Sequence, residues 1–142
     1  MKALPLVLRD HRDELWRRWT NELADAVGTD YRELVASHLG ERMLRTLVDD
    51  LIRVTEAEPY ERSALLQTIE ERATAETRHR LTLGFTVRDS VVSLHILRAA
   101  VSDTLVDALA LEEMPIFADG LDQLKALNAF LDRLVGAAVI AS

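Results

Sequence analysis

The residues of this sequence with the widest chemical range are its four histidines, and one of them follows a glutamate at helical spacing. Glu76 and His79 have the E-x-x-H pattern, which places both side chains toward one face of a helix. In di-iron bundles this motif occurs twice and two further glutamates complete the site. Here it occurs once, so we expect no metal and interpret the pair as the polar end of a helix.

His95 has two alternative interpretations. The segment His95–Ala100 is similar to the phosphoacceptor segment of histidine phosphotransfer domains, but Ala99 stands where those domains usually have Gly. Their histidine is also exposed, whereas the helix around His95 is apolar. A haem ligated by His95 would need a wide apolar pocket around it. We expect no cofactor, and phosphotransfer at His95 and a haem-binding globin-like sensor are kept as alternatives.

Arg98 falls within an apolar helical stripe, where a buried guanidinium needs a carboxylate or several carbonyl groups. On the preceding helix the apolar stripe gives way to Glu76 and Arg80, and a tight hairpin would bring Glu76 close to the level of Arg98. We therefore predict a polar cluster of Glu76, Arg80, His95 and Arg98. It would be either a structural ion pair or a small-molecule ligand or switch site, for example for an anion.

The sequence gives little support for other kinds of enzyme chemistry. The sequence contains no cysteine, which excludes disulfides, thiol catalysis and thiolate metal sites. It has neither a serine in a nucleophile-elbow motif nor a glycine-rich phosphate loop. We therefore expect a protein that is not an enzyme and assign no catalytic residue.

The elements that must position these residues are helices. Only 3 prolines and 5 glycines occur in 142 residues, and the hydrophobic period is helical nearly everywhere. This predicts one all-α domain over residues 1–142, a globin-like bundle of about five to six helices. The 87–111 helix is apolar except for Asp89, Ser93, Asp103 and Asp107, so we expect it to lie centrally. The expected helices span residues 5–27, 30–40, 41–56, 59–83, 87–111 and 115 to near the C-terminus.

The last helix, within residues 115–142, carries apolar residues alternately four and three apart, a heptad pattern with Asn128 at an a position. A polar residue there can fix register and oligomeric state. We predict this helix as the dimer or output helix. Because it is still apolar at its end, we expect either a domain cut from a longer protein or a stand-alone relative of one. The predicted seam consists of Phe117, Leu121, Leu124, Asn128, Leu131 and Val135.

The charge and hydropathy of the sequence limit which partners and which cellular location we expect. The formal net charge is −7, whereas a nucleic-acid-binding domain usually has a basic footprint, so nucleic acid is not an expected partner. No apolar run approaches the roughly 20 residues of a membrane span, so we expect no membrane insertion. The start of the chain lacks the features of a signal peptide, which favours a cytoplasmic protein.

Three segments of the chain resemble the N-terminal domain of the RsbR/RsbRD class of stressosome co-antagonists, which is also found ahead of some bacterial histidine kinases. They are Leu8–Trp19, Arg80–Asp89 and the pair Leu97 and Arg98, and the resemblance covers roughly Leu8 to Leu109. It implies a globin-like helical domain that binds no haem, dimerises, and relays signals to a C-terminal output module such as a STAS domain or a kinase. It implies no catalytic residue.

Together these observations favour a cytoplasmic, homodimeric sensory or protein-interaction module of bacterial signal transduction. Its partners would be other signalling proteins or a C-terminal output domain. Input at the bundle would shift the packing or rotation of the last helix, which passes the change onward.

Overall fold

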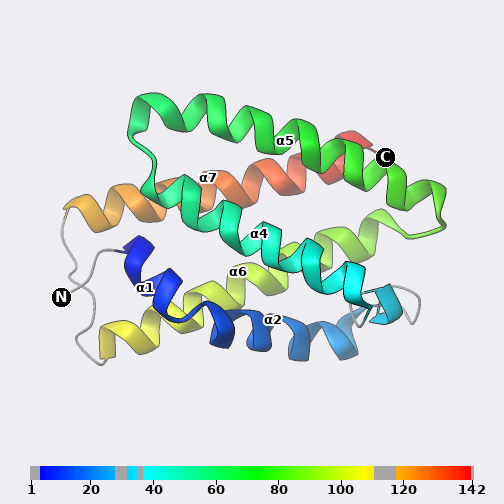
Figure 1. Ribbon diagram of the computed structural model, residues 1–142, viewed down its shortest axis with the longest axis horizontal. Helices are drawn as coiled ribbons and strands as arrows, with labels where there is room; N and C mark the ends of the chain where they lie inside the picture. The colour runs from blue at the N-terminus through cyan, green and yellow to red at the C-terminus, as the bar shows by residue number, and fades with distance from the viewer. Residues whose placement is uncertain (1–3, 28–31, 35–36, 111–117, 142) are drawn as a thin grey trace.

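The computed structural model of the chain describes residues 4–27, 32–34, 37–110 and 118–141. These residues form helices and their connections, without a strand among them, which confirms the predicted all-α class (Figure 1). The main helices are α1 (Leu4–Asp10), α2 (Arg12–Ala26), α4 (His38–Glu56), α5 (Pro59–Thr82), α6 (Val87–Ala110) and α7 (Ala118–Ala141).

The helix predicted over residues 5–27 is interrupted at His11. The backbone of His11 has a φ of −105° and a ψ of 18°, although hydrogen bonds continue on both sides, from the His11 N–H to Val7 and from the Leu15 N–H to His11. The change of direction lets α1 contact α4, α6 and α7 with its buried residues, while α2 packs mainly along α6. Of the helix predicted over residues 30–40, residues 32–34 are helical and 38–40 belong to α4, while 30, 31, 35 and 36 lie outside the described residues.

Several helix ends follow from local sequence chemistry. The Ser37 side chain accepts a hydrogen bond from the Gly40 N–H at 3.1 Å, so α4 begins at His38, three residues before the predicted start. Gly84 adopts a φ of +94°, which favours glycine, and ends α5. Thr86 accepts a hydrogen bond from the Asp89 N–H at 3.2 Å and caps α6. Pro59 occupies the first turn of α5.

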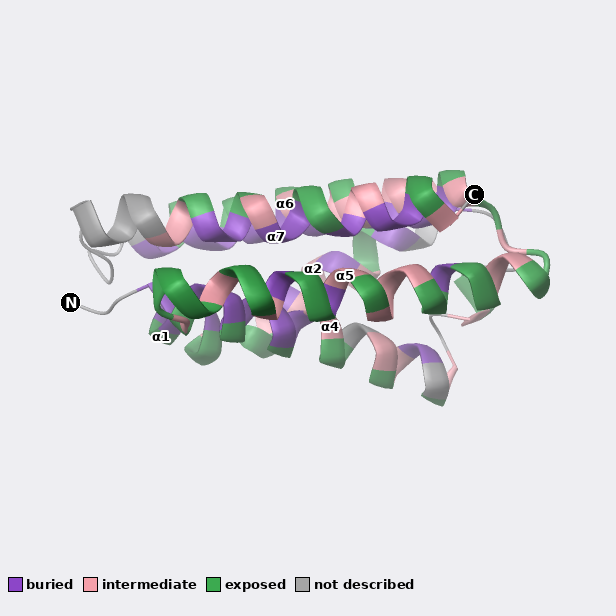
Figure 2. Ribbon diagram, turned by 90° about the horizontal axis from the view of Figure 1, so that it is seen from above, coloured by how far each residue is buried: buried purple, intermediate pink, exposed green. Residues whose placement is uncertain are grey.

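The helices form two layers (Figure 2). Helices α6 and α7 make one layer, and α1, α2, α4 and α5 make the other. Helix α6 contacts α1, α2, α5 and α7, in agreement with its predicted central place, and α7 likewise contacts α1, α4, α5 and α6. Of the four polar residues singled out on α6, Asp89 and Ser93 are buried, whereas Asp103 and Asp107 are exposed. No described helix has the length and apolar character needed to cross a membrane.

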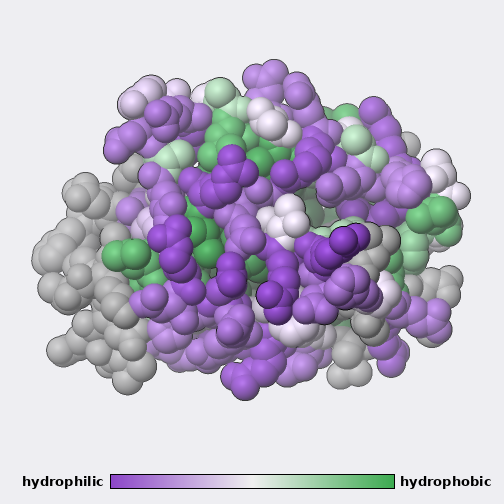
Figure 3. Space-filling view, viewed as in Figure 1, coloured by the Kyte–Doolittle hydropathy of each residue, from purple (hydrophilic) through white to green (hydrophobic). Residues whose placement is uncertain are grey.

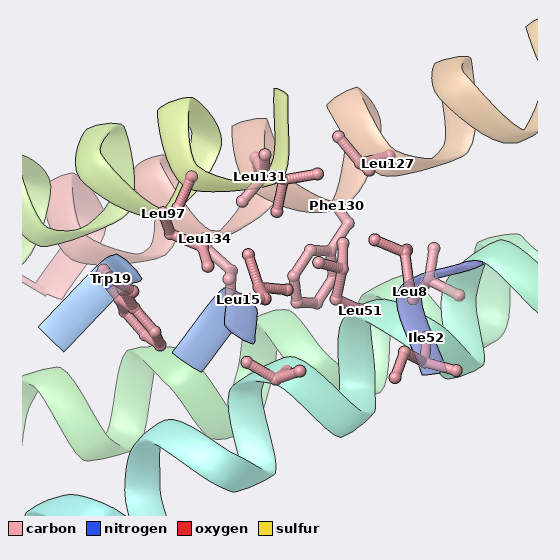
Figure 4. Close-up of a cluster of buried hydrophobic side chains, with 14 of the residues drawn as sticks. Leu8, Leu15, Trp19, Leu51, Ile52, Leu97, Leu127, Phe130, Leu131 and Leu134 are labelled. Atoms are coloured by element: carbon pink, nitrogen blue, oxygen red, sulfur yellow. The ribbon is translucent and has the colours of Figure 1, made fainter. Parts of the chain in front are cut away.

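The two layers enclose one hydrophobic core (Figure 4). Its centre is Phe130 of α7, which is fully buried with its ring between Leu15 and Leu51. At one end of the core lies Trp19 of α2, whose indole N–H donates a 2.9 Å hydrogen bond to the Ser93 carbonyl of α6. This bond ties α2 to α6 and fixes the indole ring, which also forms one wall of the site described below.

Candidate functional site

A cavity lies where α4, α5, α6 and α7 meet beside Trp19. In Figure 3 this face of the molecule is hollowed between α4 and α5, and apolar atoms are visible in the floor. The cavity volume is about 70 Å³, enough for several water molecules or one small organic ion. Part of the wall is apolar, and it is formed by Trp19, Met43, Leu47, Leu94, Leu134 and Ala138.

Arg80, in the last turn of α5, supplies the positive charge of the cavity. Its Nη2 donates to the Thr77 hydroxyl at 3.1 Å, which holds the guanidinium group in place. Its Nε is buried and has no acceptor among the described residues. Within the described part of the chain, no carboxylate oxygen lies within 4.0 Å of Arg80. The guanidinium group therefore brings to the cavity a positive charge that no described carboxylate pairs with, and an anionic ligand would be favoured there.

Three hydroxyl side chains line the same cavity, from Thr77 on α5 and from Ser90 and Ser93 on α6. Thr77 donates to the Ala73 carbonyl at 2.8 Å. Ser90 and Ser93 are almost fully buried, yet neither hydroxyl forms a hydrogen bond to another described residue. The cavity therefore offers two hydroxyl groups that can donate to a ligand or accept from it.

Glu76 lines the cavity at its rim, with its side chain half exposed. It faces Arg72 rather than Arg80, because one of its carboxylate oxygens lies 3.8 Å from the Arg72 Nε. Arg72 also pairs with Asp50 of α4, whose side chain is only 3% exposed. A chain of alternating charges therefore runs from the buried Asp50 through Arg72 to the rim of the cavity.

The structure brings together only half of the predicted cluster of Glu76, Arg80, His95 and Arg98. Glu76 and Arg80 line the cavity, but His95 is exposed on the outer side of α6. Arg98 is 36% exposed and donates to Asp132 of α7 at 2.7 Å. The inward face of α6 is centred on the fully buried Leu97, and the next residue is turned by about 100°, which directs Arg98 toward α7 instead of the core.

Sequence reasoning missed the two serines and Asp132. Ser90 and Ser93 lie three residues apart and in register with Leu97, so the buried face of α6 includes them. That spacing is a signal that the sequence offers for a buried polar site on this helix. Nothing in the local sequence pairs Asp132 with Arg98, because their contact depends on how α6 and α7 pack.

The predicted seam on α7 is divided between the core and the surface. Phe117 and the side chain of Leu121 lie outside the described residues. Leu131 is buried in the core and cannot contact a second subunit while the bundle is intact, which corrects its assignment to the seam. Leu124 is half-buried and packs against the core. The outer face of α7 consists of Asn128 and Val135 from the predicted seam and of Asp132 and Val139, which are in register with them.

A second charged cluster, around Arg18, joins α2 to α6. The hydrogen bond from Arg18 to the Asp107 carboxylate raises the pKa of the guanidinium above its already high ordinary value, and Glu14 adds to this effect. Arg18 also contacts the Thr104 hydroxyl at 3.4 Å. Because these partners of Arg18 lie on α2 and α6 themselves, we interpret this cluster as a structural contact between the two helices.

Comparisons with known proteins give no match: no family model fits the sequence, and no curated protein or solved structure is similar to it. The class that the fold defines is therefore the all-α helical bundle, with a small polar-and-apolar cavity between its layers. Among the described residues, no three histidine, aspartate or glutamate side chains are placed to hold a metal ion.

Proposed function

We propose that the chain is a non-catalytic sensory or protein-interaction domain of bacterial signalling, of the globin-like RsbR/RsbRD N-terminal type. It would act in the cytoplasm and respond through α7. The observation that carries this proposal is that α7 both lines the cavity and presents an outer face on the surface of the bundle. Leu134 and Ala138 of α7 line the cavity, whereas Val135 and Val139 lie on its outer face.

This arrangement gives a direct route from input to output. Occupation of the cavity would press on Leu134 and Ala138, and α7 would rotate or slide against α5 and α6. Helix shifts of one to two Å at a packed interface are a common means of signal transfer. The residues that such a shift displaces on the outer side would be read by a partner protein or by an output domain.

We further propose that the first partner is a second copy of this chain. The layer of α6 and α7 is covered by helices on one side only (Figure 2). Its outer side combines the small residues Ala99 and Ser102 of α6 with the outer face of α7. Two such helix pairs can pack as a four-helix arrangement around a two-fold axis, where the same surface of each copy is used.

The dimer is tested by two adjacent substitutions on α7. Val139 is 58% exposed on the outer face, and Ile140 is 59% exposed but faces α5, where it borders a groove with Arg133 and Glu70. Val139→Asp should weaken dimerisation at least about tenfold, because it would place two carboxylates in a dry interface. Ile140→Asp, the matched control, should leave dimerisation unchanged.

Sedimentation velocity and native mass spectrometry measure this directly, since the monomer mass is 16.0 kDa. A wild-type protein that remains monomeric at about 100 µM would contradict the dimer, given that homodimers of this size associate well below that concentration. Equal effects of the two substitutions would contradict the assigned face. Circular dichroism of each variant checks that the helices are intact.

One observation favours the phosphotransfer alternative. His95 is exposed, as a phosphoacceptor must be, and so is Ala99 one turn later. If this alternative holds, His95 accepts a phosphoryl group on an imidazole nitrogen from the aspartyl phosphate of a response regulator. Incubation with a phosphorylated response regulator should then label the wild type but not His95→Gln. The haem alternative lacks a comparable observation, because the cavity beside Trp19 is much smaller than a porphyrin.

A further inference from the structure

The cavity beside Trp19 combines a fixed cation, two hydroxyl groups and an apolar wall, which together define the chemistry of its ligand. We propose that it binds a short-chain aliphatic monocarboxylate, with the carboxylate on Arg80 and the serines and the alkyl tail among the apolar side chains. This inference rests on the proposed function, because it names the input that the domain would sense.

The head of the ligand is assigned from Arg80. The two Nη groups of arginine lie at one edge of the guanidinium plane and match the two oxygens of a carboxylate. In this chain Arg80 has no carboxylate partner among the described residues, and its Nη2 is oriented by Thr77. A carboxylate on this edge would balance the charge of Arg80, and Ser90 and Ser93 could donate to its remaining lone pairs.

The alkyl tail of the ligand is inferred from the apolar wall opposite Arg80. Leu94, Leu134 and Ala138 belong to α6 and α7, and Trp19 is held against them by its hydrogen bond to the Ser93 carbonyl. An alkyl chain would remove this surface from water, at roughly 0.8 kcal/mol per buried methylene group. A cavity of about 70 Å³ limits that chain to a few carbon atoms.

The preference for a ligand with a single negative charge is inferred from the position of Glu76. Its carboxylate lines the same cavity on the side opposite to the core, half exposed and directed toward Arg72. A dicarboxylate or a phosphate dianion would bring a second negative charge close to Glu76, in a site with one cation. Repulsion of that second charge should make the cavity selective for monoanions.

The test is a titration of the ¹⁵N-labelled protein with sodium butyrate, propionate, succinate and inorganic phosphate at constant ionic strength. The chain has two tryptophans, so the spectrum contains two indole N–H signals. The Trp19 signal should shift saturably with butyrate, while that of Trp16, which stacks with Arg45 outside the cavity, should move little. Succinate and phosphate should bind at least about tenfold more weakly.

Two arginines of α5 provide the matched variants. Arg80→Gln should weaken butyrate binding at least about tenfold, because it removes a charge-assisted bidentate contact. Arg78→Gln should bind as the wild type does, since Arg78 is exposed and borders the groove on the other side of α5. The melting temperature of Arg80→Gln should equal or exceed that of the wild type, which separates lost binding from lost folding.

Three results would overturn the proposal: no saturable shift of the Trp19 signal, unchanged binding in Arg80→Gln, or succinate or phosphate binding as tightly as butyrate. The dimer measurement reports on the proposed function separately. A protein that binds butyrate but stays monomeric would support the cavity assignment and contradict the relay through the outer face. A dimer that binds none of the four anions would support the relay and contradict the cavity assignment.

Discussion

Replacement of Phe130 by alanine is expected to lower the free energy of unfolding by about 3 to 5 kcal/mol. Phe130 is fully buried at the centre of the core, on the helix that contacts α1, α4, α5 and α6 (Figure 4). Its removal leaves a cavity between the two layers that long, well-packed helices cannot easily close. Because domains of this size are usually stable by about 5 to 15 kcal/mol, the loss is a large part of the total.

Urea denaturation followed by circular dichroism measures this change. Phe130→Leu should cost less, about 1.5 kcal/mol or below, because leucine fills much of the space. Ile140→Ala, on the same helix but largely exposed and outside the proposed dimer contact, should change stability by no more than about 0.5 kcal/mol. A loss below about 1 kcal/mol for Phe130→Ala would mean that α7 does not lie at the centre of the bundle.

The fold was largely predictable because helical periodicity and end signals are local properties. The 59–83 and 87–111 predictions agree closely with α5 and α6 as described, and the break between them follows from Gly84 and Thr86. The interruption at His11 was not predictable in this way. Apolar spacing continues through it, and the change of direction is imposed by the packing of α1 on α4 and α7.

The candidate site was predictable only in part, since its composition depends on how each helix is rotated. Glu76 and Arg80 were found because the apolar stripe of α5 ends there. Arg98 was misplaced because its neighbours on α6 are apolar on nearly every side, so the sequence fixes its inward direction only weakly. A difference of one residue, about 100° of rotation, separates the buried Leu97 from Arg98, which pairs with Asp132 near the surface.

Replacement of Arg72 by methionine is expected to destabilise the protein by about 3 kcal/mol, because it leaves the Asp50 carboxylate buried without its main partner. Among the residues that the structure describes, Arg53 alone would remain paired with Asp50, with its Nη1 3.5 Å from the carboxylate and its own side chain 61% exposed. Arg53→Met, the matched control, should therefore cost less than about 1 kcal/mol. The double variant Asp50→Asn/Arg72→Met should recover most of the lost stability, since no buried charge is left unpaired.

Arg72→Met should also weaken butyrate binding, which connects the ion pair of Asp50 and Arg72 to the cavity. Arg72 holds Glu76 away from Arg80, although Glu76 and Arg80 are four residues apart on one helix face and would otherwise attract each other. Without Arg72, Glu76 becomes free to pair with Arg80 and to compete with the ligand carboxylate. Arg72→Met/Glu76→Gln should then restore affinity without restoring stability. If both properties instead returned together, Arg72 would affect the cavity only through the stability of the fold.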